Sequence, residues 1–203
     1  MASTQPASQV STRALASPQG SVRVLAESAV MIALATVLNS VKIFTLPEGG
    51  SVTLGAMIPL LYLALRRGAK VGMAAGAVFG IVDVYFEPFI YNFPFQFLLD
   101  YPFAFGALGL AGFFSGKVGG DGGKGKGLGR AAWGVLAVAI GIAGRFVCHF
   151  LSGLIFFASY APPGMNPVLY SALYNASYLL PELAISAFVI SVLADRGLIR
   201  VGL

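Results

Sequence analysis

The sequence has few charges and almost none of the residues from which soluble catalytic or metal sites are built. Only 10% of its 203 residues are charged, 57% are hydrophobic, and the mean hydropathy is +0.83. Soluble globular domains carry about 25% charged residues, so the composition argues against an ordinary water-soluble enzyme. The single cysteine, Cys148, excludes a disulfide framework and a multi-cysteine metal site. We therefore predict an integral membrane protein.

Six apolar stretches, separated by proline, glycine and charged residues, follow one another along the chain. A spanning helix needs about 20 apolar residues, so this length allows roughly six spans and no separate soluble domain. The stretches cover residues 24–44, 52–65, 71–86, 96–114, 131–160 and 167–193. The prediction is an all-α, six-transmembrane-helix bundle forming one domain over 23–203. Residues 1–22 are predicted to be a disordered cytoplasmic tail, and the Gly/Lys-rich segment 116–130 a flexible cytoplasmic linker between the fourth and fifth helices.

The basic residues predict the orientation of this bundle. If the N-terminus is inside, eleven of the thirteen basic residues lie on the cytoplasmic side: Arg13, Arg23, Arg66, Arg67, Lys70, Lys117, Lys124, Lys126, Arg130, Arg196 and Arg200. The exceptions are Lys42 and Arg145. This asymmetry is typical of membrane proteins with both termini in the cytoplasm. The net charge of +5 is therefore a signal of membrane topology, and we predict no nucleic-acid binding.

A glycine-rich segment between the fourth and fifth spans imitates nucleotide-binding motifs. Residues 120–127 nearly match a phosphate-binding loop, but Gly127 stands where the magnesium-binding hydroxyl belongs. The same segment also fits a dinucleotide-binding glycine pattern. Both motifs require a buried strand before them and a helix after them, whereas predicted transmembrane spans lie on both sides here. We interpret the segment as a linker, and the chain has no recognisable ATPase of its own.

Ionisable residues near the outer ends of the last three spans are the most informative feature. An ionisable side chain at the middle of a spanning helix costs about 2.5–3.5 kcal/mol and persists where it faces a cavity or a partner. Arg145 and His149 are four residues apart and share a helical face with Gly153 and Phe157. Asp100 lies near the start of the fourth span. The set predicts either a ligand pocket or an Asp100–Arg145 ion pair that holds the bundle together.

Two polar residues of the sixth span are less easily placed. Tyr170 and Asn175 lie some 140° apart around a helix, so we expect them to share a pocket only if the segment begins as a loop. Asp83 on the third span is expected to face either the same cavity or a partner helix, and Glu182 receives no assigned role. Gly72, Gly76 and Gly80 repeat every four residues and predict close packing between helices inside the bundle.

The residue types also include those of a hydrolytic triad. Ser152, His149 and Asp100 supply serine, histidine and aspartate, but Ser152 is only three residues from His149 and no nucleophile elbow surrounds it. We predict no catalytic residue. His149 and Cys148 are adjacent and point to different helix faces, so we predict no metal site.

Several segments, in order and with matching spacing, resemble the thiamine-specific S component of energy-coupling factor (ECF) vitamin transporters. The likeness covers about residues 26–182 and rests on residues 46–59, 96–101, 145–153, 156–161 and 170–175. It implies a six-helix bundle of the bacterial cytoplasmic membrane that binds thiamine with high affinity under outward loops. It also implies docking onto a membrane scaffold subunit that carries two ATPases. Ala29 and Ala33 match the small-residue pair through which family members contact that scaffold.

The resemblance further implies the ligand contacts. Asp100 matches the acidic residue that hydrogen-bonds the aminopyrimidine ring, and Phe157 stands where some members have a tryptophan that stacks on the ligand. The remaining predicted thiamine-binding residues are Tyr101, Arg145, His149, Gly153, Tyr170 and Asn175. The first outer loop, Tyr85 and Tyr91 are further candidates for the lining.

Three functions follow from this sequence. The leading one is a thiamine-binding transport subunit, with thiamine as transported ligand and no cofactor. The second is an S component for another vitamin or for a thiamine precursor. The third, from a different class, is an integral membrane enzyme that uses His149.

Overall fold

The computed structural model describes residues 18–86, 94–120 and 129–202. Four of the described helices are long and apolar enough to cross a membrane. They are α2 (Pro18–Ser40), a composite helix over Pro94–Val118, α8 (Arg130–Phe156) and α9 (Pro167–Asp195). Residues 18–22 were predicted to belong to the tail but are helical, whereas residues 1–17 lie outside the described part.

Two shorter helices stand where the second and third spans were predicted. They are α3 (Met57–Arg67), with 11 residues, and α4 (Ala69–Asp83), with 15. Gly68 joins them with a φ of 89°, a left-handed value that glycine adopts without a steric penalty. At 1.5 Å per residue, α3 is about 16 Å long, or roughly half of a bilayer core of about 30 Å.

A short β-hairpin takes the end of the first predicted span and the start of the second, so the bounds of those two predicted helices were wrong, although the fold remains all-α. Strands β1 (Lys42–Thr45) and β2 (Ser51–Thr53) pair antiparallel, with Thr45 opposite Ser51. These segments are rich in β-branched residues, and the Pro-Glu-Gly-Gly sequence at 47–50 between them favours a turn. The apolar composition that suggested a membrane helix therefore serves a short strand pair.

The composite helix changes its winding along its length. It consists of α5 (Pro94–Leu98), the π-helix η1 (Leu99–Phe103), α6 (Ala104–Ala107), the 3₁₀-helix η2 (Leu108–Phe114) and α7 (Ser115–Val118). Pro102 lies inside η1 and has no amide hydrogen to donate, so regular α-helical bonding is interrupted there. Because α7 continues to Val118 and α8 starts at Arg130, the predicted linker 116–130 is shortened at both ends. Residues 121–128 lie outside the described part.

Glycines set the distance between α4 and the composite helix. A Cβ at Gly76 or Gly80 would collide with the backbone of Phe105 or Tyr101, respectively, and one at Gly72 would lie 3.1 Å from Gly109 Cα. The predicted glycine face therefore packs inside the bundle. Such close backbone approach stabilises helix pairs through van der Waals contacts.

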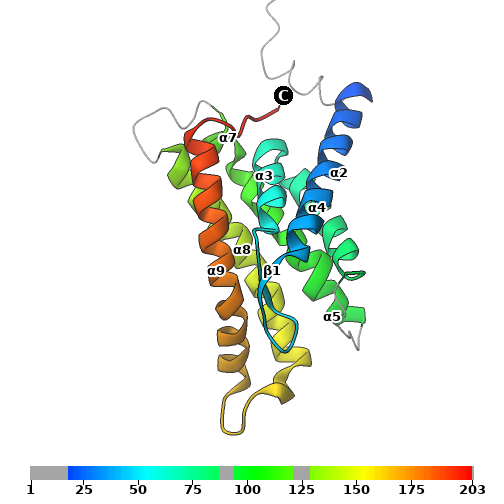
Figure 1. Cartoon of the computed structure of the whole chain (residues 1–203), viewed down its shortest axis with the longest axis vertical. Helices are drawn as coiled ribbons and strands as arrows, with labels where there is room; N and C mark the ends of the chain where they lie inside the picture. Colours follow the sequence, from blue (N-terminus) through cyan, green and yellow to red (C-terminus); the bar gives the residue numbers. More distant parts are fainter. Residues whose placement is uncertain (1–17, 87–93, 121–128, 203) are drawn as a thin grey trace, which may run out of the picture.

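The two ends of the molecule differ in content. Figure 1 shows the start of α2, α7 and the described C-terminus at one end, with the hairpin and the α8–α9 connection toward the other. The half that contains α3 is filled by fully buried leucines, among them Leu60, Leu61 and Leu63. Because α3 is short, it crosses only part of the bundle, and the hairpin that precedes it in the chain lies beside the remaining part. This arrangement leaves room for a cavity beside the hairpin.

Candidate ligand-binding site

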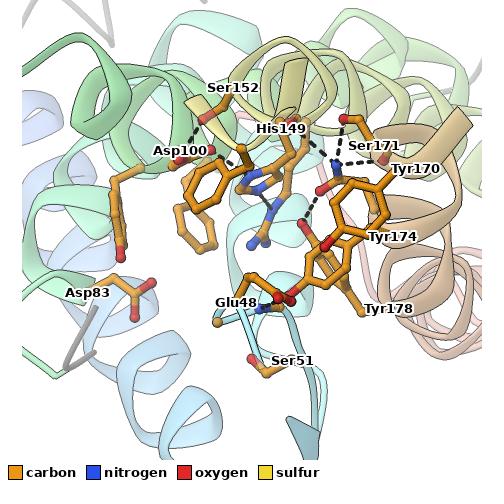
Figure 2. Close-up of a pocket in the computed structure, with 18 of the residues that line it drawn as sticks. Glu48, Ser51, Asp83, Asp100, His149, Ser152, Tyr170, Ser171, Tyr174 and Tyr178 are labelled. Carbon is orange, nitrogen blue, oxygen red and sulfur yellow. Dashed lines mark hydrogen bonds and ion pairs between the residues drawn. The ribbon is translucent and has the colours of Figure 1, made fainter. Parts of the chain in front are cut away.

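A cavity of about 850 Å³, measured with its open mouth, lies between the hairpin and the helices α2, α4, η1, α6, α8 and α9. All eight residues predicted to contact a ligand line it: Asp100, Tyr101, Arg145, His149, Gly153, Phe157, Tyr170 and Asn175. Figure 2 shows Asp100, His149 and the α9 tyrosines around this space.

Asp100 is held by two side chains of α8. Its Oδ1 lies 3.1 Å from His149 Nδ1, and its Oδ2 accepts a hydrogen bond of 2.7 Å from Ser152 Oγ. Asp100 itself lies in the π-helical segment η1, which alters the direction of the side chains relative to a regular helix. The sequence could not show this winding, although Pro102 was a signal for an irregularity.

His149 connects the carboxylate to the cation of the site. Arg145 Nε donates to His149 Nε2 over 3.1 Å. Since a guanidinium can only donate, Nε2 accepts, and the ring proton sits on Nδ1, from which it is donated to Asp100. The guanidinium carbon of Arg145 also lies 3.9 Å from the centre of the Phe105 ring, a cation–π contact. The imidazole thus lies between Asp100 and Arg145, in place of the direct ion pair considered from the sequence.

The same contacts give the serine, histidine and aspartate a geometry unlike that of a hydrolase. In a catalytic triad the serine hydroxyl bonds to the histidine and the carboxylate bonds to the other ring nitrogen. Here Ser152 donates to Asp100, while His149 Nε2 is occupied by Arg145. The histidine is therefore not placed to activate the serine.

Helix α9 supplies the opposite wall. The five lining residues Tyr170, Ser171, Tyr174, Asn175 and Tyr178 fall within an arc of about 140° at 100° per residue. The expectation that Tyr170 and Asn175 need a loop to share a pocket was wrong, because α9 is helical from Pro167 and one broad face includes both. Tyr178 Oη donates to Asn175 Oδ1 over 2.8 Å, and Asn175 Nδ2 donates to the Ser171 carbonyl over 2.9 Å.

Gly153 serves the packing of α8 against α9. A Cβ at this position would collide with Ser171 Oγ and lie 3.5 Å from Asn175 Nδ2. From the sequence we expected the glycine to let a flat ligand approach the backbone. The space that a side chain would need is taken by α9, so glycine here lets the two walls of the cavity come together.

Several lining residues were not identified individually from the sequence. The hairpin tip contributes residues 48–51, and Gly50 N–H donates to Tyr174 Oη over 3.1 Å. The first outer loop had been named only as a candidate region, and no periodicity marks its tip. Of the two tyrosines named with it, Tyr85 is 87% exposed and is not a lining residue, and Tyr91 lies outside the described part.

A second carboxylate, that of Asp83, also lines the cavity. Asp83, at the end of α4, is buried and accepts a hydrogen bond of 2.6 Å from Asn39 Nδ2 of α2. Figure 2 shows Asp83 on the side of the cavity away from the α9 tyrosines. Among the residues that the structure describes, the carboxylates of Glu48, Asp83 and Asp100 line the cavity, against one guanidinium, that of Arg145. This balance favours a cationic ligand.

The two alanines predicted to contact a scaffold lie elsewhere. Ala29 and Ala33 are on the exposed side of α2, and neither lines the cavity. The structure thus separates the predicted ligand contacts from the predicted docking pair.

Comparisons with known proteins agree on one family. Residues 25–198 match the thiamine transporter protein family Thia_YuaJ. The chain is 37% identical over 172 residues to the thiamine transporter ThiT of Bacillus subtilis. The aligned region covers 83% of this chain and 88% of that protein. It is 33% identical over 178 residues to ThiT of Lacticaseibacillus paracasei, over 84% of this chain and 86% of the relative.

A solved structure has the same fold. ThiT from Listeria monocytogenes superposes with a TM-score of 0.74 at 26% identity, covering 86% of this chain and 94% of that one. The curated relatives are named as transporters rather than enzymes. The long apolar helices likewise fit a membrane protein. On the family match and the two curated relatives, this chain belongs to the thiamine transporter family.

Proposed function

We propose that this protein is the high-affinity thiamine-binding subunit of an ECF-type importer. It captures thiamine outside the cell, and ATP hydrolysis on partner subunits drives release inside. The observation that carries the proposal is a cavity lined by three carboxylates, one guanidinium and several aromatic rings. Thiamine is a cation with two flat heteroaromatic rings, so both the charge and the ring surfaces match.

Asp100 is the proposed anchor for the aminopyrimidine ring. A carboxylate has about four acceptor positions, and His149 and Ser152 occupy two of those on Asp100. The remaining positions can accept the N–H groups of the ligand. Arg145 acts through His149 by fixing the ring orientation, which in turn fixes the carboxylate.

Aromatic side chains are the proposed contacts for the cationic ring. Phe157 and Tyr170 line the cavity, and a cation over an aromatic face is attracted by its quadrupole. Asn175 and Tyr101 add polar groups to the lining, and Gly153 closes the gap between α8 and α9.

The proposed topology is six spans in the bacterial cytoplasmic membrane, with α3 and α4 as the two short ones and both termini in the cytoplasm. Its support is the basic residues, since Arg66, Arg67 and Arg196 lie at the ends of α3 and α9. The proposed partners are a membrane scaffold and two ATPases. Ala29 and Ala33 form the proposed docking site, because α2 is the helix with the least burial.

The first experiment is thiamine binding to the detergent-purified protein by isothermal titration calorimetry. Riboflavin, biotin and the hydroxymethyl-aminopyrimidine precursor of thiamine serve as comparison ligands. We expect tight binding of thiamine and no binding of riboflavin or biotin. A folded preparation that ignores thiamine contradicts the proposal, and tighter binding of the precursor would assign the site to that compound.

Coupling is tested separately in proteoliposomes. Radiolabelled thiamine uptake is measured with this chain alone and after co-reconstitution with a scaffold and its two ATPases. We expect uptake only in the complete complex with ATP. Concentrative uptake by the chain alone would contradict the proposed division of labour.

A further inference from the structure

The geometry points to Glu182 as a positioning residue that fixes the hairpin over the cavity and thereby slows ligand release. Glu182 lies in α9, is 1% exposed and does not line the cavity. The inference rests on the proposed function only in taking thiamine as the ligand. It adds a role for a buried carboxylate that the ligand contacts do not use.

Glu182 binds the hairpin at the base of its second strand. One carboxylate oxygen, Oε1, accepts from Thr53 N–H over 2.5 Å and from Thr53 Oγ over 2.6 Å. Thr53 is itself 4% exposed, so both bonds lie in the interior. Hydrogen bonds to a charged group in a buried setting are among the stronger ones in proteins.

Thr53 also contacts the start of the next helix, α3. Its Oγ accepts a hydrogen bond of 3.0 Å from Ala56 N–H, directly before α3 begins at Met57. A single hydroxyl thus joins Glu182, the end of β2 and the start of α3. The hairpin leaves the bundle from this point, so the direction of its strands depends on it.

The tip of the hairpin has a weaker attachment to the same helix. Gly50 N–H donates to Tyr174 Oη over 3.1 Å, and Tyr174 is half-buried. Tyr174, Tyr178 and Glu182 follow at intervals of four residues and so lie along one side of α9. One helix therefore carries the cavity wall, the contact to the hairpin tip and the buried anchor at the hairpin base.

The hairpin needs such an anchor. A two-stranded hairpin alone is at best marginally stable, and residues 43–45 of β1 are exposed. Only β2 has buried residues, Val52 and Thr53, of which Thr53 is bonded to Glu182. Loss of this bond leaves the tip residues Gly50 and Ser51, which line the cavity, without a fixed base.

Within the described residues, Oε2 of Glu182 and Oγ of Ser186, one turn further along α9, are buried without a hydrogen-bond partner. Ser186 therefore gives a matched control. Ser186→Ala alters a buried polar group of the same helix without touching the hairpin.

The test measures thiamine association and dissociation by stopped-flow fluorescence. For Glu182→Leu we expect dissociation at least about tenfold faster, equivalent to about 1.4 kcal/mol, with association changed far less. Glu182→Gln keeps a carbonyl acceptor for Thr53 and should stay close to wild type, as should Ser186→Ala. Unchanged dissociation in Glu182→Leu overturns the inference, and so does an equal acceleration in Ser186→Ala.

Thr53→Val supplies a second variant should Glu182→Leu fold poorly. It removes the hydroxyl bond but keeps the backbone N–H, so a smaller acceleration is expected. Combined with Glu182→Leu, its effect should be smaller than the sum of the single effects, because both changes remove the same interaction. Additive effects contradict a shared role.

A ligand-free measurement separates this inference from the thiamine assignment. Spin labels at Phe44→Cys in β1 and Val192→Cys in α9, both exposed positions, report the hairpin position in a Cys148→Ser background. We expect one narrow distance distribution, broadened by Glu182→Leu and unchanged by Ser186→Ala. If thiamine does not bind at all, this distribution still tests the anchor. Equal distance distributions in Glu182→Leu and Ser186→Ala would overturn the proposed role of Glu182.

Discussion

Helix α2 and the composite helix Pro94–Val118 have similar hydropathy but opposite surroundings. Their most apolar windows average 1.8 and 1.5, yet 6% of the residues are buried in the first and 50% in the second. Apolar composition stabilises a helix in lipid, whereas burial within a bundle depends on which residues allow close packing. Hydropathy therefore predicted that both segments would enter the membrane, but it did not predict which of them would be buried inside the helix bundle.

The contacts of the two helices show the reason. The composite helix packs against α4 at Gly76 and Gly80, where a Cβ would collide with its backbone, while a Cβ at Gly72 would collide with Ala64 of α3. Helix α2 forms ion pairs from Glu27, near its middle, to Arg66 and Arg67, and a hydrogen bond from Asn39, near its C-terminal end, to Asp83. The buried helix supplies Asp100 to the cavity, and the exposed one keeps a long apolar face for another protein or for lipid.

The largest effect is expected on the buried helix. Asp100→Ala removes the partner of His149 and Ser152 together with the proposed ligand anchor. Truncating one member of a buried, charged hydrogen-bonded set costs about 2–5 kcal/mol, or roughly 30-fold or more in Kd. Calorimetry with thiamine measures the loss. Asp195→Ala, at the end of α9 and exposed, is the control, and equal affinities would contradict the role of Asp100.

Substitutions on the exposed helix α2 are expected to reduce transport while leaving thiamine affinity unchanged. Enlarging Ala29 and Ala33 together to leucine blocks close approach by a scaffold helix, so we expect ATP-driven uptake to fall about tenfold or more. Thiamine affinity should stay within about twofold, because neither residue lines the cavity. Uptake assays and calorimetry on the same preparation distinguish the two. Leu34→Phe enlarges another exposed side of α2 and should retain uptake.

A packing variant tests why one helix is buried. Gly76→Ala places a methyl group against the Phe105 carbonyl, and overpacking of this kind costs about 1–3 kcal/mol. We expect a lower thermal unfolding temperature, measured with a thiol-reactive or intrinsic-fluorescence assay. Gly116→Ala, where no atom lies within 4 Å, should be neutral or slightly stabilising. Equal shifts in the two variants would show that glycine packing does not separate the two helices.

The smallest effect is expected at Phe157, the residue directly after α8. Phe157→Trp enlarges the aromatic face beside the proposed cationic ring and should tighten thiamine binding by about two- to fivefold, or roughly 0.5–1 kcal/mol. Phe157→Leu removes the face and should weaken binding to a similar extent. Fluorescence titration measures both changes. Tighter binding by the leucine variant would show that the contact is not aromatic.

The sequence predicted the cavity better than it predicted the path of the chain around it. Asp100, Arg145 and His149 were identified because ionisable residues in apolar spans need a cavity or a partner, a rule that depends on local composition alone. The hairpin was missed since Ile43, Phe44 and Val52 are equally apolar in a strand and a helix. The sequence left open whether Asp83 faces the cavity or a partner helix, and it assigned no role to Glu182, because their partners, Asn39 and Thr53, are 44 and 129 residues away along the chain.

The sequence by itself determined the class of protein, since transfer free energy of apolar segments depends on composition and length. It also indicated the ionisable residues of the binding site, because an ionisable side chain is unfavourable in lipid unless it faces a cavity or a partner. Only the tertiary structure decided that His149 lies between Asp100 and Arg145, that Gly153 serves the approach of α8 to α9, and that one buried carboxylate holds the hairpin. These outcomes depend on contacts between segments that are distant in the sequence, and a one-dimensional pattern does not specify which of them meet.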